Sequence, residues 1–250
     1  MTSISSVIST LLLLTLCACA SQGTRTASDI KPGTLLERTI TAQGAPHKFA
    51  IWVPASYDAS MPNPCVLFLH GSGECGTDGR KQTTVGLFPA ATADTSQWAC
   101  VIVMPQKPVE SAEWEEYEPM VLAELAEAKR ELNIDPHRTS LTGLSQGGHG
   151  TWIIGARHAN IFSALAPCCG YAHPNTVAPR IAGKPIWAFH GEKDDVVNPE
   201  ETRKMVAAVK SLRKAPEPKI TLFPDLNHSC WDRAYRAEGL GQWLLAQKLP

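Results

Sequence analysis

Short apolar runs, each bounded by Gly, Pro or polar clusters, recur along the chain from residue 35 onward. Two β-leaning segments, 35–41 and 49–53, flank a turn at Gly44-Ala45-Pro46 and predict a hairpin. Strands buried on both faces are predicted at 65–69, 100–104, 140–142, 163–166, 186–189 and 220–223. The pattern therefore predicts an antiparallel pair followed by a series of buried strands.

Apolar residues at helical spacing predict helices between and after these strands. One begins near Pro119 and continues through Val121, Leu125, Ala128 and Leu132; another has Met205, Val206, Val209 and Leu212 on one face; a last one covers 233–249. Strands that alternate with helices after an opening hairpin predict an α/β fold, with a mainly parallel, doubly wound sheet. The sequence contains no internal repeat.

Length and charge narrow the class of protein. With 250 residues, of which 44% are apolar, the chain can bury one sizeable core, and we expect a single domain over 34–250. The formal net charge is −1, and no Lys/Arg cluster forms the basic patch that a nucleic-acid partner would need. Nothing in the sequence implies a protein partner.

The N-terminus predicts export. An apolar run from Val7 to Leu16 is too short to span a bilayer, which takes about 20 residues, but it suits the core of a signal peptide over 1–20. The small polar residues that follow predict a flexible tether over 21–33.

The tetrad Leu16-Cys17-Ala18-Cys19 resembles a bacterial lipobox, in which Cys19 would carry a lipid anchor that attaches the protein to a membrane. Cleavage after Ala18 or Ala20 without lipid is the competing interpretation. The expected location is thus periplasmic, lipid-anchored or secreted. Mass spectrometry of the mature N-terminus distinguishes these alternatives.

Six cysteines remain after removal of the signal peptide: Cys65, Cys75, Cys100, Cys168, Cys169 and Cys230. An oxidising compartment permits disulfides, but six cysteines allow fifteen pairings and the sequence cannot choose among them. Cys65 and Cys100 each begin a predicted strand, which suggests a bridge between neighbouring strands. Because no Cys-x-x-Cys or His-x-x-x-His pair provides ligand spacing, no metal or other cofactor is expected.

The run Gly143-Leu144-Ser145-Gln146-Gly147 matches the Gly-x-Ser-x-Gly nucleophile elbow. A β-leaning segment, 138–142, precedes it and an apolar segment that suits a buried helix, 150–157, follows it. Side chains at positions 143 and 147 would collide with the neighbouring strand and helix in such a turn. Ser145 is therefore the first candidate nucleophile; a plain glycine-rich loop is the alternative.

Further polar groups follow other predicted strands, at the sheet edge where α/β folds collect functional residues. Together they resemble the α/β-hydrolase superfamily, and within it the small secreted esterases grouped with polyhydroxybutyrate depolymerases, feruloyl esterases and predicted peptidases. The motifs that carry this resemblance are Leu69-His70-Gly71-Ser72-Gly73-Glu74, Met104-Pro105-Gln106, Asn133-Ile134-Asp135-Pro136, the elbow, Phe189-His190-Gly191-Glu192-Lys193-Asp194 and Asn227-His228-Ser229-Cys230-Trp231-Asp232.

The resemblance implies a catalytic triad in the chain order Ser, acid, His, made by Ser145, Asp194 and His228. His228 is the one histidine that follows the candidate acid. The His-Gly-x-x-Asp pattern selects Asp194, with Asp195 as its nearest rival and Asp225 and Asp232 as weaker ones. A surface-loop role for the histidine and a turn-capping role for the acid are the alternatives.

The resemblance also implies an oxyanion hole formed by the backbone N–H groups of Ser72 and Gln146. Gly71 and Gly73 allow the first loop to turn back toward the site. His70 is expected to brace that loop through hydrogen bonds and to take no part in catalysis.

Glu74, Trp114 and Trp231 are candidate substrate contacts, because each follows a predicted strand end or the candidate base. Packing in the core is the default role of such aromatic side chains, and Glu74 has a loop-solvating role as its alternative.

The expected function is that of a cofactor-independent serine hydrolase that cleaves carboxylic esters of small molecules, polysaccharides or polyesters through an acyl-enzyme. A serine peptidase with the same triad is an alternative, although amide cleavage usually needs an added domain or an extended groove. A non-catalytic, hydrolase-like binding protein is the other alternative, since fold alone does not establish activity.

Overall fold

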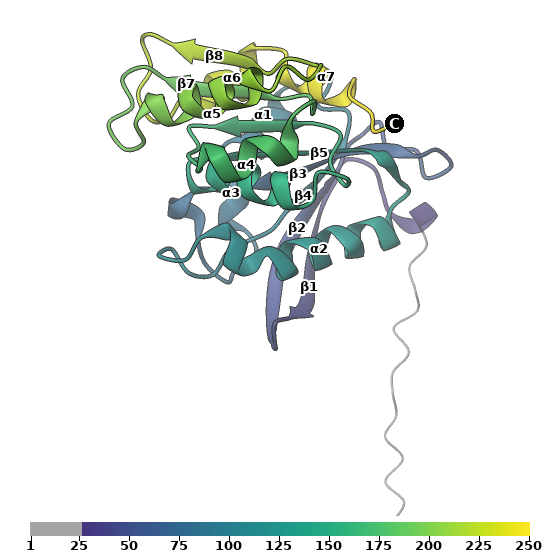
Figure 1. Ribbon diagram of the computed structural model, residues 1–250. Helices are drawn as coiled ribbons and strands as arrows, with labels where there is room; N and C mark the ends of the chain where they lie inside the picture. The colour runs from purple at the N-terminus through teal and green to yellow at the C-terminus, as the bar shows by residue number, and fades with distance from the viewer. Residues whose placement is uncertain (1–26) are drawn as a thin grey trace, which may run out of the picture.

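The computed structural model describes residues 27–250, which form one eight-stranded sheet with helices around it (Figure 1). The strands are β1 (Thr34–Ala42), β2 (Ala45–Val53), β3 (Asn63–Leu69), β4 (Val101–Met104), β5 (Ile134–Leu144), β6 (Leu165–Cys168), β7 (Trp187–Gly191) and β8 (Lys219–Phe223). Their order is β1-β2-β4-β3-β5-β6-β7-β8, with β1 and β2 antiparallel to their neighbours and the others parallel. The predicted hairpin and mainly parallel sheet are confirmed.

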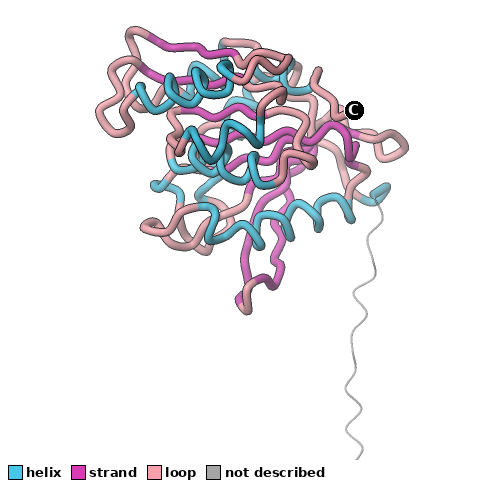
Figure 2. Tube along the Cα trace, viewed as in Figure 1, coloured by secondary structure: helices cyan, strands magenta, loops and turns pink. Residues whose placement is uncertain are grey.

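Seven α-helices and four 3₁₀ turns connect the strands in the described residues. The helices are α1 (Leu87–Ala93), α2 (Glu118–Glu131), α3 (Gln146–Arg157), α4 (Pro174–Ile181), α5 (Pro199–Ser211), α6 (Trp231–Ala237) and α7 (Leu240–Leu245), and the turns are η1 (Ala27–Asp29), η2 (Ser72–Glu74), η3 (Lys81–Thr83) and η4 (Trp114–Tyr117). Figure 2 shows the helices packed in layers against the strands, with loops gathered at the sheet's ends.

The sheet separates two hydrophobic clusters. Successive residues of a strand point to opposite faces, and accordingly Leu67 and Leu69 pack with α2, α3, α4 and α5, whereas Val66 and Phe68 pack with α1, α6 and α7. All four of these side chains are fully buried. Helices thus cover both faces, which confirms the doubly wound arrangement.

Several element boundaries differ from the sequence-based expectation. Strands β2 and β3 begin earlier than 49 and 65, β5 is longer than 140–142, and β6 begins two residues later than predicted. The single C-terminal helix expected over 233–249 is wrong: Gly239 adopts φ = 70° and separates α6 from α7. A left-handed residue ends a helix, and glycine adopts that conformation without steric cost.

The folded domain starts before residue 34. Ile30 is buried in the first cluster, and the Gly33 N–H donates to Val53 O at 2.9 Å. Part of the segment expected as a tether therefore packs on the domain. The expected signal peptide, Cys19 and residues 21–26 lie outside the described residues. None of the helices described is both long and apolar enough to cross a bilayer.

The six cysteines from Cys65 to Cys230 are all free thiols, so the expected bridge between Cys65 and Cys100 is absent. The register explains this result. Cys65 pairs with Val101 rather than with Cys100, and the two thiols belong to the clusters on opposite faces of the sheet.

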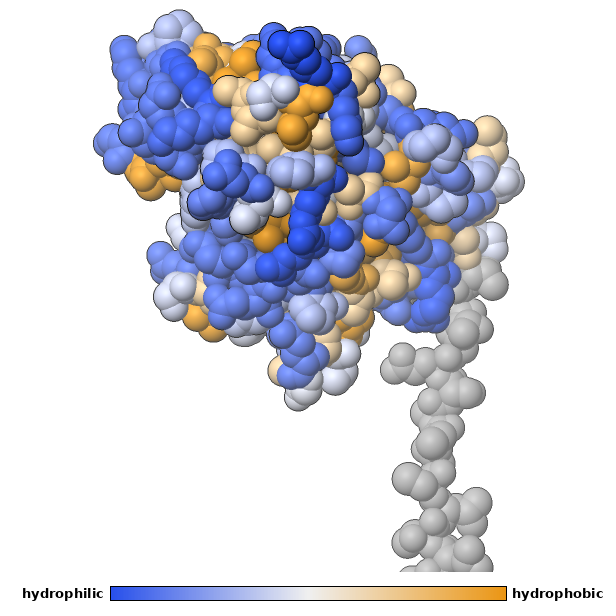
Figure 3. All heavy atoms as spheres, viewed as in Figure 1, coloured by the Kyte–Doolittle hydropathy of each residue, from blue (hydrophilic) through white to orange (hydrophobic). Residues whose placement is uncertain are grey.

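The face of the molecule drawn in Figure 3 is mainly polar. In Figure 3 apolar side chains are scattered among charged ones on the face in view and form no single large area. Among the described residues the large hydrophobic side chains that are exposed are Met61, Val109, Val196, Leu212 and Ile220.

Candidate active site

Ser145 lies on a sharp turn between β5 and α3 and has φ = 55°, an uncommon conformation for a residue with a side chain. The flanking glycines are required by space. A Cβ on Gly147 would lie 1.9 Å from Leu69 O, and one on Gly143 would lie 2.3 Å from Gly147 O. Because both contacts are with backbone, neither can relax easily. The predicted strand, elbow and helix are confirmed.

Three side chains from distant parts of the sequence meet at this turn. His228, in the loop between β8 and α6, places Nε2 3.0 Å from Ser145 Oγ and Nδ1 2.8 Å from Asp194 Oδ2. Asp194 follows β7 and its side chain is fully buried. A carboxylate can only accept, so the shared proton lies on His228 Nδ1, which leaves Nε2 free to accept the Ser145 hydroxyl proton.

Asp194 is held as a carboxylate. Burial alone would raise its pKa, but hydrogen bonds from His228, Val197 and Val196 outweigh burial and keep the pKa below its usual range. The Val196 and Val197 N–H groups both donate to Oδ1 at 2.9 Å. Oδ1 therefore fixes the carboxylate, and Oδ2 faces the histidine.

His190, at the end of β7, is a second partner of the same carboxylate that our sequence reasoning did not assign. Its Nε2 lies 3.0 Å from Asp194 Oδ2 and 2.9 Å from Val197 O, while its Nδ1 lies 2.7 Å from Thr202 Oγ1. Burial lowers the His190 pKa despite the neighbouring carboxylate, so the ring is neutral at pH 7. Nε2 faces two acceptors and therefore carries the proton.

The rival acids lie elsewhere. Asp195 is exposed, and the carboxylate that His228 Nδ1 contacts belongs to Asp194. Asp225 forms an ion pair with Arg233 at 2.6 Å, and Asp232 is an exposed residue in the first turn of α6. Of the candidate carboxylates, Asp194 is the one that the fold brings to His228.

The two expected oxyanion donors both lie at the start of a helical turn. Gln146 is the first residue of α3 and Ser72 the first of η2, so neither N–H has an acceptor within its own helix. Gly71 brings the η2 loop against the elbow, because a Cβ there would lie 3.5 Å from Ser145 Cβ. Two donors without intrahelical partners thus flank the serine.

His70 braces this loop, as expected. Its Nδ1 donates to Gly71 O at 2.6 Å, and its Nε2 accepts the Lys107 N–H at 2.9 Å. The ring is fully buried, and burial lowers its pKa to about 4. His70 is therefore a neutral, fixed hydrogen-bonding group.

The three candidate substrate contacts have different surroundings. Trp114 has no exposed surface, donates Nε1–H to His70 O at 3.1 Å and packs edge-on against that ring, so it supports the loop from inside the core and is not available to a substrate. Glu74 accepts the Gly71 N–H at 3.1 Å, and burial raises its pKa. Trp231 is partly buried and packs edge-on against His228, with ring centroids 5.3 Å apart.

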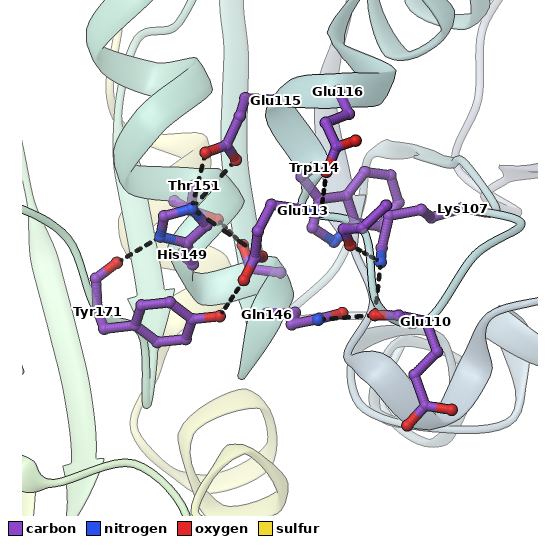
Figure 4. Close-up of polar contacts among 12 residues, drawn as sticks. Lys107, Glu110, Glu113, Trp114, Glu115, Glu116, Gln146, His149, Thr151 and Tyr171 are labelled. Carbon is purple, nitrogen blue, oxygen red and sulfur yellow. Dashed lines mark hydrogen bonds and ion pairs between the residues drawn. The ribbon is translucent and has the colours of Figure 1, made fainter.

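Lys107 is a buried cation behind the site that our sequence reasoning also missed. Its Nζ donates to the carbonyls of Val109 at 2.6 Å and Glu110 at 3.3 Å, and to that of Ala112. The Gln146 side chain donates to the same Glu110 carbonyl at 2.9 Å (Figure 4). The 109–112 loop is thus tied to the elbow helix. A lysine three residues after the end of an apolar strand was the available sequence signal.

A family model for esterases matches residues 40–243, which is most of the chain. The chain belongs to this esterase family. The sheet order, the helices on both faces and the elbow are those of the α/β-hydrolase superfamily.

Individual relatives agree with this assignment. The chain is 30% identical over 163 residues to a bifunctional acetylxylan esterase/xylanase from Neocallimastix patriciarum. The matched region covers 62% of this chain and 22% of that protein. It resembles the crystal structure of a thermostable esterase with a TM-score of 0.76 and 26% identity, over 86% of this chain and 63% of that one. The chain therefore spans only part of the length of each of these relatives.

A ferulic acid esterase from Anaeromyces mucronatus, solved in complex with ferulic acid, has a TM-score of 0.65 over 90% of this chain and 97% of its own. At 14% identity this likeness establishes the fold alone.

Proposed function

We propose that this protein hydrolyses carboxylic esters through an acyl-enzyme on Ser145, with His228 as general base and Asp194 as the orienting acid. The observation that supports this most strongly is the line of contacts from Ser145 Oγ to His228 Nε2, 3.0 Å, and from His228 Nδ1 to Asp194 Oδ2, 2.8 Å. A serine hydroxyl becomes an effective nucleophile when a base held in one tautomer takes its proton. The family match supports the same chemistry.

In the first half-reaction Ser145 Oγ attacks the ester carbonyl while His228 Nε2 takes the hydroxyl proton. The resulting imidazolium is stabilised by the Asp194 carboxylate. The N–H groups of Ser72 and Gln146 donate to the oxyanion, and a donor of this kind is worth about 3–4 kcal/mol of transition-state stabilisation. Collapse of the tetrahedral intermediate breaks the ester bond, and His228 returns the proton to the leaving alcohol.

In the second half-reaction water attacks the acyl group on Ser145. His228 Nε2 now removes a proton from the water and returns it to Ser145 Oγ when the acid leaves. These residues perform each proton transfer without a cofactor.

The names of the relatives suggest the substrate class. One is an acetylxylan esterase/xylanase and another was solved with ferulic acid. We therefore place acetyl or feruloyl esters of polysaccharide, or small-molecule models of them, ahead of polyester as substrates. Trp231, beside His228, is the aromatic side chain positioned to contact an acyl group.

We also propose that the protein is exported. The signal peptide over 1–20 and lipidation of Cys19, which lie outside the described residues, would place the catalytic domain in the periplasm, on a membrane surface or in the medium. The mass of the mature N-terminus distinguishes a lipidated Cys19 from a free one.

The test compares initial rates on two esters, p-nitrophenyl acetate and methyl ferulate, with initial rates on the anilides of the same two acyl groups. Ester turnover should exceed anilide turnover. Asp194→Asn should lose most of the activity, because it fixes the wrong His228 tautomer, while the matched variant Asp195→Asn keeps it. Faster anilide than ester cleavage would indicate a peptidase, and equal loss in both variants would contradict the assignment of the acid.

A further inference from the structure

A second cluster of titratable side chains is centred on His149, one helical turn after Ser145 in α3. It consists of Glu113 and Glu115 at η4, His149 in α3 and Tyr171 after β6 (Figure 4). The His149 N–H donates to Ser145 O at 3.0 Å, and only 8% of His149 is exposed. The ester mechanism uses none of these side chains.

The hydrogen bonds of His149 fix its tautomer. Nδ1 lies 2.8 Å from the backbone carbonyl of Tyr171, which can only accept, so Nδ1 carries a proton. In the neutral ring the Nε2 lone pair then points at Glu115, whose Oε2 and Oε1 lie 3.1 and 3.3 Å away. A lone pair that faces a carboxylate is repelled unless a cation lies between them.

Glu113 directs a further carboxylate oxygen at His149 Nε2. Its Oε2 lies 4.0 Å from that nitrogen, is buried and has no hydrogen-bond partner. A buried carboxylate oxygen without a hydrogen bond is costly, so a cation at this point would stabilise Glu113 as well as Glu115.

Outer contacts hold these ligands in place. The Tyr171 hydroxyl donates to Glu113 Oε1 at 2.7 Å, and the Tyr171 ring stacks on His149 with centroids 4.6 Å apart. The bond from His149 Nδ1 to a carbonyl and the bond from Tyr171 to the carboxylate are the outer-shell partners that metal ligands normally have.

We propose that His149 Nε2, Glu113 Oε2 and a Glu115 carboxylate oxygen bind a divalent metal ion of the zinc class. Their ligand atoms lie within 4.8 Å of one another. Two tetrahedral ligands about 2.1 Å from an ion are separated by about 3.4 Å, and the observed separations of 3.1 and 4.0 Å from Nε2 lie on either side of that value. One imidazole with two carboxylates suits Zn²⁺.

The position of the site indicates its role. An ion there would tie η4, the first turns of α3 and the segment after β6 together, next to the nucleophile elbow. The side chains of Glu113 and Glu115 remain about one-third exposed, at 33% and 28%, while Glu113 Oε2 itself is buried, so the site lies at the edge of the core. The ion would stabilise the framework around Ser145, and its binding does not depend on ester hydrolysis.

The test is calorimetric titration of ZnSO₄ into the mature protein, free of any affinity tag and dialysed against chelator. We expect one ion per chain and a higher Tm with zinc. The Co²⁺ form should lack the near-ultraviolet charge-transfer band that a thiolate ligand gives, since every proposed ligand atom is N or O. Glu115→Gln should weaken binding at least tenfold, and Tyr171→Phe about 10–100-fold through loss of its outer-shell bond.

Two variants separate this site from other sources of binding. His158→Gln should bind zinc normally, because His158 pairs with the single carboxylate of Glu118 at the far end of the same helix. Cys169→Ser tests the other group of potential ligands in the described residues, Cys169, Asp194 and His228. Failure of the folded native protein to bind zinc, which would mean that a proton alone occupies Nε2, overturns the proposal. So does binding that survives Glu115→Gln or disappears in Cys169→Ser.

Discussion

His190 Nε2 lies 3.0 Å from Asp194 Oδ2, the carboxylate oxygen that His228 Nδ1 contacts at 2.8 Å. One oxygen thus accepts from two imidazole rings, and the two backbone donors, Val196 and Val197, occupy the other oxygen. Because the His190 pKa is lowered by burial, this second ring donates a hydrogen bond without adding a charge. His190 is therefore a positioning residue for the carboxylate.

The variant His190→Gln should reduce kcat for p-nitrophenyl acetate by about 10–100-fold, because a hydrogen bond to a charged group is worth about 1.5–3 kcal/mol. KM should change little, since His190 is buried behind the acid. Steady-state kinetics with circular dichroism as a fold check measure this. A folded variant with wild-type kcat would show that the second hydrogen bond is dispensable.

The space around the elbow glycines predicts a sharp contrast in stability. Gly147→Ala should lower the free energy of unfolding by at least about 3 kcal/mol, or prevent folding, because its Cβ would overlap Leu69 O. Gly73→Ala is the matched control in the neighbouring loop, where nothing lies within 4 Å of the added Cβ. Urea unfolding curves compare them, and equal stability of both variants would contradict the described elbow.

The free energy of unfolding should decrease as the pH is lowered from about 6.5 to about 4. The pKa of His70 is about 4 in the native state because the ring is buried, against about 6.5 in an unfolded chain. Above pH 6.5 His70 is neutral in both the native and the unfolded state. Between pH 6.5 and 4 the unfolded state binds a proton at His70 and the native state does not. This difference lowers the free energy of unfolding by about 3 kcal/mol at pH 4.

The lowered pKa of His190 acts in the same direction, whereas the lowered pKa of Asp194 matters only where an unfolded aspartate titrates, near pH 4 and below. Chemical unfolding from pH 4 to 7 measures the slope. His70→Gln should be less stable at pH 7 and have a shallower slope. An unchanged slope in that variant would mean that His70 is not the titrating group.

Lys107 is expected to matter through the loop that it holds. Lys107→Met leaves the carbonyls of Val109, Glu110 and Ala112 without their charged donor and should cost about 1–3 kcal/mol of stability. Lys210→Met is the control, because that side chain is 61% exposed, and it should change stability by less than about 0.5 kcal/mol. Similar melting temperatures for both variants would show that the buried ammonium is not needed.

Much of this architecture could be predicted from local pattern. The hairpin, most of the buried strands and the helix after Ser145 follow from apolar runs and glycine spacing, and the tight turn of the elbow motif itself requires glycine at positions 143 and 147. The C-terminal helices could not be predicted correctly, because the apolar period continues across Gly239 and only its left-handed conformation separates them.

Roles that depend on contacts between distant segments could not be predicted from the sequence. His190 and Lys107 gained their roles from burial, which sequence does not display. Trp114 was expected near a substrate and instead supports His70 from the core. His149 and Glu115 are 34 positions apart and carry no ligand spacing, so the cluster they form with Glu113 depends on the fold.

The most direct test of the central claim is covalent labelling with a fluorophosphonate, followed by peptide mapping in the mass spectrometer. The account predicts one label per chain, on Ser145, and none in Ser145→Ala. It also predicts much slower labelling in His228→Gln, which lacks the base. A folded native protein that takes no label, or that carries it on another residue, would contradict the assignment of Ser145 as the nucleophile.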